Sequence, residues 1–184
     1  EISEEMALIP PEGIKRGFAG LMNAYNGQRV GAGTVAMGIA AGAYELALDF
    51  SKERKQFGRP IYEFQGLQWM LADMHIQIEA ARLLLRKAAA GNTEILGNGN
   101  EFPDMLEAAK AKIFASEMAI KVTNDALQIF GSSGYSRNFP LERMTRDARM
   151  FTIGGGTAQI LRTVVASALL EEKLPQTRDG YSKK

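Results

Sequence analysis

The amino-acid sequence predicts an all-α fold, an antiparallel up-and-down four-helix bundle. Four long segments repeat apolar residues at the three- and four-residue spacing of one helix face. Glycine, proline and asparagine separate these segments, and most of the breaks are short, as in antiparallel bundles. No segment shows the alternation of apolar and polar residues that marks a half-buried strand.

The composition narrows the possible functions. The 184 residues, 46% hydrophobic and 23% charged, suffice for one globular domain with its own core. The net charge of +1 gives no electrostatic basis for binding nucleic acid, and no apolar run approaches the roughly 18 residues of a membrane span. The chain has no cysteine and a single histidine, His75, so disulfides, thiol catalysis and a metal site are not expected. No secretory signal is visible, so we expect a cytoplasmic protein, and the start at Glu1 is expected of a fragment or a processed product.

The first helix is expected over residues 21–52. Residues 1–20 contain Pro10, Pro11, Gly13 and Gly17, and we expect an irregular lead-in that ends a preceding domain. Inside the helix each glycine costs roughly 1 kcal/mol relative to alanine. For Gly31, Gly33, Gly38 and Gly42 we expect that close approach of a neighbouring helix or a ligand offsets this cost.

Three more helices complete the expected bundle domain, residues 21–172. The second spans 63–90 and carries one buried stripe, made of Leu67, Met70, Leu71, Met74, Ile78, Ala81 and Leu85. A glycine- and asparagine-rich loop at 91–103 precedes the third helix, 104–130, where large aliphatic residues recur every seven positions. A short helix is expected near Pro140 and the last helix over 158–170, followed by a loose tail at 173–184.

Three consecutive glycines, Gly154 to Gly156, lie directly before the last helix. Glycine allows positive φ and close approach of the backbone to a ligand. The free N–H groups of the helix start, at Thr157 and beyond, can face a phosphate or another acceptor. Two interpretations stay open at this point, a tight turn between helices and a ligand-binding loop.

Three sequence blocks together resemble the C-terminal half of the acyl-CoA dehydrogenase family. The first is ERKQFGRPI at 53–61 with FQ at 64–65. The second is ALQIFG at 126–131 with GY at 134–135, PLER at 140–143 and RDA at 146–148, and the third is GTAQI at 156–160. The resemblance implies a C-terminal four-helix bundle of a flavoprotein that acts on acyl-CoA thioesters. It also implies FAD as cofactor, a homo-oligomer (dimer or homotetramer) with FAD at the subunit interface, and an electron-transfer flavoprotein as partner if the protein is a dehydrogenase.

The resemblance assigns roles to individual residues. Arg54 matches the arginine that meets the FAD pyrophosphate, and Phe57 the aromatic near the adenosine. Gln128, with the turn at Gly131, matches the amide that binds the FAD of a neighbouring subunit, whereas Thr157 and Gln159 match FAD contacts at the start of the last helix. The substrate side is implied at Arg29, near the acyl-CoA, and at Gly156 of the loop.

The chain departs from the family at its catalytic base. Dehydrogenation in the family removes an α-proton with a carboxylate, either a glutamate directly before the Gly-Thr of the last loop or one directly before the arginine of the first helix. These two positions hold Gly155 and Gln28 here, and neither is a carboxylate. Loss of a positioned base typically costs about 10²–10⁴ in rate. Gly154 further opens the loop, since many members have an aromatic residue there.

Three readings of the resemblance and one outside it remain open. In the first, the protein is an α,β-dehydrogenase whose base comes from elsewhere. In the second, it is a sulfinyl-acyl-CoA desulfinase, in which Gln28 orients the sulfinate or the thioester. In the third, it is a non-catalytic partner subunit. The fourth is a helical adaptor that binds no flavin.

Overall fold

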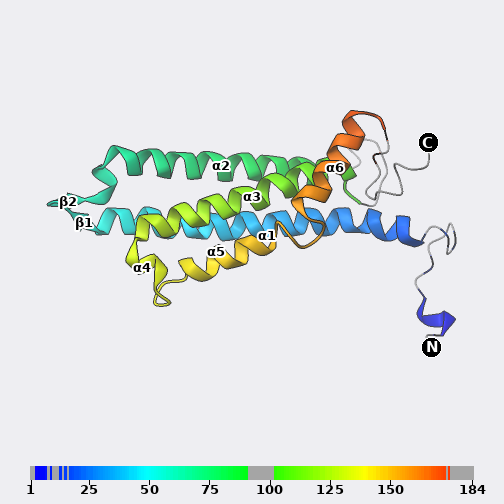
Figure 1. The fold of residues 1–184 in the computed structure, drawn as a ribbon, viewed down its shortest axis with the longest axis horizontal. Coiled ribbons are helices and arrows are strands. Elements are labelled where there is room, and N and C mark those ends of the chain that lie inside the picture. Colours follow the sequence, from blue (N-terminus) through cyan, green and yellow to red (C-terminus); the bar gives the residue numbers. More distant parts are fainter. Residues whose placement is uncertain are drawn as a thin grey trace.

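Three long helices, each antiparallel to the next along the chain, form the body of the domain (Figure 1). The computed structural model describes residues 3–7, 9, 13, 15, 17–90, 102–172 and 174. The long helices are α1 (Gly17–Glu53), α2 (Gln65–Ala90) and α3 (Met105–Phe130). Shorter elements are η1 (Glu4–Met6), β1 (Lys55–Gln56), β2 (Arg59–Pro60), η3 (Ile61–Glu63), α4 (Ser132–Tyr135), α5 (Leu141–Met150) and α6 (Ala158–Leu169).

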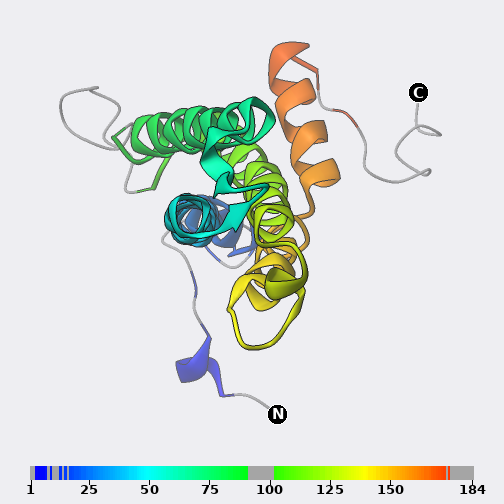
Figure 2. The same cartoon turned by 90° about the vertical axis from the view of Figure 1, so that its left-hand side faces the viewer.

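The fourth position of the bundle is divided between two helices. α5 packs against α1 and α3 near the end that carries the β1–β2 hairpin, whereas α6 packs against α3 at the opposite end. Figure 2 shows α6 inclined to the axes of the long helices. The all-α fold with up-and-down helices is therefore confirmed, with α5 and α6 each covering part of α3.

Small side chains allow α1 and α3 to lie close together. α1 turns one line of alanines into the core, Ala36, Ala40, Ala43 and Ala47, and all four are fully buried. Of the four helix glycines, Gly33 faces Leu85 so closely that an added Cβ would lie 2.8 Å from its Cδ2 atom, and Gly42 is near Met144. Gly31 and Gly38 face open space, so close packing accounts for only two of the four glycines.

The helix boundaries follow local signals. Asp104 caps α3 by accepting a hydrogen bond of 2.9 Å from the backbone N–H of Glu107, and Thr157 caps α6 by accepting one of 3.2 Å from Ile160. α1 begins at Gly17, four residues before the expected start of the first helix. The expected buried stripe of α2 is correct, and His75 lies on the exposed side. The loop at 91–101 and nearly all of the tail at 173–184 lie outside the described residues.

The β1–β2 hairpin was not expected from the sequence. Its two strands have two residues each, and Phe57 and Gly58 form its turn with φ of 52° and 79°. Two positive φ angles in succession suit the right-handed twist of a tight hairpin. Strands this short cannot display a sequence alternation, which is why no strand was expected.

α1 also corrects the expectation about membrane spans. Its residues Gly20–Glu53 are long and apolar enough to cross a membrane by length and composition. Alanine and glycine supply this apolar character without a continuous run of large apolar side chains. For this reason the sequence did not predict an apolar helix of membrane-spanning length. The core helix of a globular bundle passes the same test, and α1 contributes its alanine line to such a core.

Candidate functional site

The glycine loop joins α5 to α6 and is both a tight turn and an open surface. Gly154 donates its N–H to Met150 O at 2.9 Å, as expected of a turn. Gly155 and Gly156 have φ of 71° and 93°, a region that glycine enters without steric cost. An added Cβ at Gly155 would meet no atom within 4 Å, so the space in front of the loop is open on this side.

Two buried cations hold the carbonyl oxygens of this loop. Lys112 of α3 is fully buried and donates from Nζ to Gly156 O at 2.7 Å. Arg29 of α1 is 9% exposed; its Nε lies 3.5 Å from Gly155 O, and its Nη1 donates to Asn26 Oδ1 at 2.7 Å. The loop is therefore attached to both α1 and α3 through its backbone.

Burial sets the electrostatics of this pair. Desolvation lowers the pKa of Lys112, and the nearby charge of Arg29 lowers it further; desolvation also lowers the pKa of Arg29. Neither shift has a carboxylate among its causes, and in the described part of the chain no acidic side chain forms an ion pair with either residue. The loop is thus flanked by positive charge that lacks a negative partner.

The two positions that lack a carboxylate lie on segments that contact each other. Gln28 is exposed on α1 and directly precedes Arg29, whose Nε lies 3.5 Å from the carbonyl oxygen of Gly155. α1 and the glycine loop are therefore joined next to these two positions, of which one holds an amide and the other no side chain.

A pocket of about 620 Å³ lies at the hairpin end of the bundle, between the end of α1, the hairpin and the α3–α4 junction. Four of the six cofactor residues that the sequence indicated line it, namely Arg54, Phe57, Gln128 and Gly131. Phe50 and Phe130 form its floor, with ring centroids 4.0 Å apart. The pocket therefore combines aromatic surface with a cation and an amide.

Phe57 exposes an aromatic ring at the edge of this pocket. It is 93% exposed at the tip of the hairpin, and its φ of 52° is unusual for a bulky side chain. Its ring meets the edge of Phe64 at a centroid distance of 6.1 Å, and Arg59 lies over the Phe64 ring at 4.2 Å. The hairpin thus presents an aromatic ring to the outside at some conformational cost.

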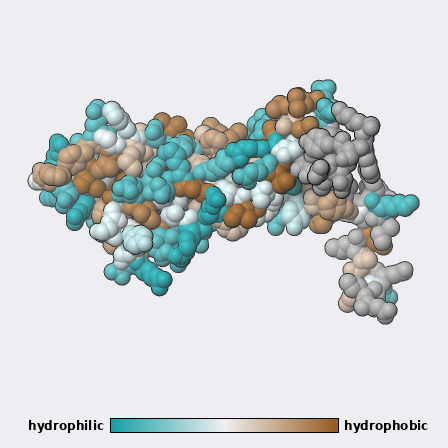
Figure 3. All heavy atoms as spheres, viewed as in Figure 1, coloured by the Kyte–Doolittle hydropathy of each residue, from teal (hydrophilic) through white to brown (hydrophobic). Residues whose placement is uncertain are grey.

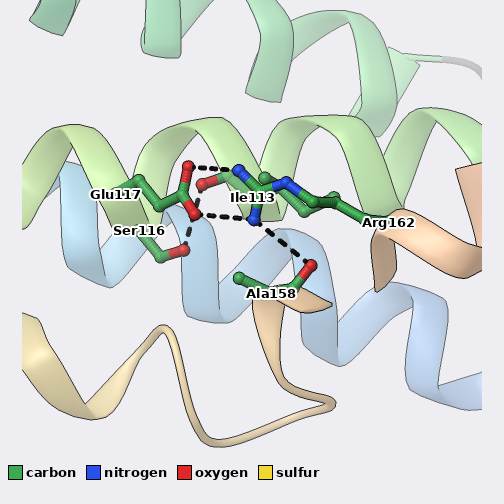
Figure 4. Close-up of polar contacts among 5 residues, drawn as sticks. All are labelled: Ile113, Ser116, Glu117, Ala158 and Arg162. Atoms are coloured by element: carbon green, nitrogen blue, oxygen red, sulfur yellow. Dashed lines mark hydrogen bonds and ion pairs between the residues drawn. The ribbon is translucent and has the colours of Figure 1, made fainter. Parts of the chain in front are cut away.

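The other two cofactor residues lie elsewhere. Thr157 and Gln159 line a second pocket, of about 250 Å³, with Arg149 of α5 and Glu117 of α3. Glu117 forms a two-point ion pair with Arg162 of α6, with both N–O distances 2.7 Å, as Figure 4 shows. This pair ties the start of α6 to α3 and lowers the pKa of Glu117 through its hydrogen bond to Arg162.

The six residues therefore form two groups. The hairpin and the start of α6 are at different ends of the bundle in Figure 1, so the six do not line one continuous pocket. Sequence reasoning also missed Lys112, Asn26 and Glu117. The available signal for Lys112 was its position among the buried alanines of α3, where a charged residue is unusual.

Similarity to solved structures defines the class of protein. The fold resembles butyryl-CoA dehydrogenase from Megasphaera elsdenii with a TM-score of 0.79 and 43% identity, over 84% of this chain and 39% of that one. It also resembles a glutaryl-coenzyme A dehydrogenase in complex with glutaryl-CoA, with a TM-score of 0.77 and 37% identity, over 83% of this chain and 38% of that one. The fold is that of the C-terminal helical part of acyl-CoA dehydrogenases.

Residues 15–170 match the family described as acyl-CoA dehydrogenase, C-terminal domain. The chain belongs to this family. It is 65% identical over 181 residues to a 3-sulfinopropanoyl-CoA desulfinase of Cupriavidus necator, covering 98% of this chain and 44% of the relative. A desulfinase of the same name from Variovorax paradoxus is 67% identical over 183 residues, covering 100% of this chain and 44% of the relative. The chain thus spans less than half the length of these relatives.

Proposed function

We propose that the protein to which this domain belongs is a flavin-dependent desulfinase that acts on 3-sulfinopropanoyl-CoA. The observation that carries the proposal is the absence of a carboxylate from both base positions, Gln28 and Gly155, on two segments that Arg29 joins. The names of the two desulfinase relatives supply the substrate class. An α,β-dehydrogenation needs a base at this place, whereas desulfination does not.

The balance of the reaction explains why neither a base for an α-proton nor an external oxidant is needed. The bond between the β-carbon and sulfur breaks, the carbon receives a proton, and the sulfur receives the hydroxyl of water. The products are propanoyl-CoA and hydrogen sulfite. The electron pair of the broken bond stays with carbon, so carbon is reduced, sulfur is oxidised, and no electrons leave the substrate.

The residues around the glycine loop suit an anionic substrate. Arg29 and Lys112 add two positive charges without a carboxylate partner among the residues described, and positive charge attracts the sulfinate. The Gln28 amide can donate a hydrogen bond to the sulfinate or the thioester, and unlike glutamate it does not repel the anion. The open space in front of Gly155 leaves room for the sulfinyl group.

FAD fits the chemistry of the two pockets. Arg54 offers a charged fork for a pyrophosphate, Phe57 an exposed ring for stacking, and Gln128 an amide beside the Gly131 turn. Thr157 and Gln159 lie at the start of α6, where N–H groups and the helix dipole favour an acceptor. FAD would supply the flat flavin ring beside which the acyl chain lies.

The separation of the two pockets supports a homo-oligomer, a dimer or a homotetramer, in which one FAD contacts two copies of the chain. Three large apolar residues on α2, Trp69, Ile76 and Leu83, are more than 60% exposed and recur every seven positions, which forms one line along the helix. Figure 3 shows further apolar surface around α6. Such a line on a charged surface suits the contact between copies.

A second candidate is an acyl-CoA dehydrogenase that passes electrons to an electron-transfer flavoprotein. It is favoured by the similarity to dehydrogenases, and to a structure reported for the electron transferring flavoprotein of Acidaminococcus fermentans, with a TM-score of 0.79 and 46% identity over 85% of this chain and 40% of that one. Its base would come from the part of the protein outside this chain. A non-catalytic partner subunit would show neither activity.

The test uses the full-length, FAD-loaded protein. Incubation with 3-sulfinopropanoyl-CoA is expected to release one sulfite per substrate, and a panel of saturated acyl-CoAs with an artificial electron acceptor is expected to give no turnover. Turnover of the panel without sulfite release would favour the dehydrogenase, and a protein purified without flavin would contradict both candidates.

A further inference from the structure

The glycine loop shows two different faces of its backbone. The carbonyl oxygens of Gly155 and Gly156 are bound by Arg29 and Lys112. The N–H groups of Gly155, Gly156 and Thr157 have no acceptor in the part of the chain that the structure describes. Three successive backbone donors are thus left for a ligand.

The geometry of the peptide bond links the two faces. The described chain contains no cis peptide bond, and in a trans peptide the N–H points away from the C=O of the same unit. The oxygen of Gly156 and the N–H of Thr157 belong to one peptide unit, so the hydrogen bond from Lys112 to this oxygen turns that N–H away from the bundle. Arg29 acts in the same way on the unit shared by Gly155 and Gly156.

Lys112 stabilises the turn at a high cost in desolvation free energy. Its side chain is fully buried, its ammonium makes one hydrogen bond within the described residues, and Arg29 repels it. A buried charge without a partner of opposite sign costs free energy that an ordinary interhelix turn does not require. The neighbouring turns of α3 are filled with alanine and serine at the same depth, Ala108, Ala109, Ala111, Ala115 and Ser116.

We propose that Lys112 is a positioning residue, which fixes the peptide unit shared by Gly156 and Thr157 so that the N–H groups of the loop face the carbonyl oxygen of a bound acyl thioester. Consecutive N–H groups in a loop with positive φ form a concave site for an acceptor oxygen. The proposal rests on the proposed function only in that an acyl-CoA lies over this loop. It assigns a role to a residue that does not touch the substrate.

The experiment measures binding by calorimetry on the full-length, FAD-loaded protein, with propanoyl-CoA and with free CoA, which lacks the acyl carbonyl. The variant is Lys112→Met, which keeps the length and removes the donor. Its control is Lys121→Met on the same helix, where the lysine is 53% exposed and pairs with Asp125. Loss of one well-placed hydrogen bond to the carbonyl corresponds to a rise of about tenfold in Kd.

The wild-type protein is expected to bind propanoyl-CoA more tightly than CoA. Lys112→Met is expected to bind propanoyl-CoA about tenfold more weakly and to keep its affinity for CoA within about twofold. Lys121→Met is expected to change neither affinity. If Lys112→Met does not fold, Lys112→Gln, which is too short to reach Gly156 in the same way, is expected to show the same selective loss. An equal loss for both ligands, or no loss, overturns the proposal. Because no turnover is needed, this result is independent of whether the protein releases sulfite.

Discussion

Substitution of Gln28 by glutamate supplies a carboxylate where the chain lacks one. Gln28 is exposed on α1, and Gln→Glu exchanges an amide for a carboxylate of the same shape, so no packing is lost. Arg29 follows directly and is nine-tenths buried at the same site. Its charge keeps the new carboxylate ionised and lowers its pKa, which makes it available as a base but a weaker one.

The magnitude follows from these two effects. A positioned base contributes about 10²–10⁴ in rate, or about 3–5 kcal/mol of barrier. Because Arg29 weakens the base, we expect a gain near the lower limit, about 10²-fold. Gly155→Glu places the same group on the loop, where no atom obstructs its Cβ, but its φ of 71° costs about 1–2 kcal/mol in stability.

The assay is anaerobic mixing of the full-length, FAD-loaded variants with propanoyl-CoA, followed at the flavin absorption band. Gln28→Glu is expected to bleach the band about 10²-fold faster than the wild type, and Gln28→Met, which has no base, at the wild-type rate. If neither Gln28→Glu nor Gly155→Glu bleaches the band faster, then the missing carboxylate is not what prevents dehydrogenation, and the reasoning fails.

Three further predictions concern stability and cofactor binding. Gly33→Ala should destabilise the fold by about 1–3 kcal/mol, whereas Gly31→Ala, in open space, should stabilise it by about 0.5–1 kcal/mol, both by chemical denaturation. The pKa of Glu117 is lowered by Arg162, so the ion pair stabilises the fold at neutral pH and this stability is lost as the pH falls through the lowered pKa. Melting curves of Glu117→Gln should differ from the wild type by at most about 1 kcal/mol near pH 7, because both side chains are about half exposed, and should converge with it in acid. Arg54→Met should weaken FAD binding about tenfold or more by calorimetry, and unchanged binding would remove Arg54 from the cofactor site.

The long helices were predictable because their burial repeats over many turns. Met74, Ile78 and Leu85 of α2 are buried as the spacing of apolar residues indicated. The hairpin was not predictable, because its strands are too short for any period and because Phe57 takes a φ that its residue type disfavours. Local residue propensities do not predict a backbone conformation that tertiary contacts determine.

The arrangement of the candidate site could not be predicted from the sequence. Sequence blocks indicated Arg29, Gln28 and the glycine loop, and the structure brings Arg29 to Gly155 across 126 positions of the chain. The division of the cofactor residues between two pockets depends on where each helix ends in space. Lys112 became visible as a candidate only through its hydrogen bond to Gly156, because a charge on an apolar stripe gives no hint of its acceptor.

The central claim is that this domain serves a reaction in which the substrate is cleaved without net redox change. One anaerobic sample of the full-length, FAD-loaded protein with 3-sulfinopropanoyl-CoA tests it, with sulfite and the flavin absorption band followed together. We expect stoichiometric sulfite release while the flavin band stays that of the oxidised form. Bleaching of the band in step with substrate consumption, without sulfite, would contradict it.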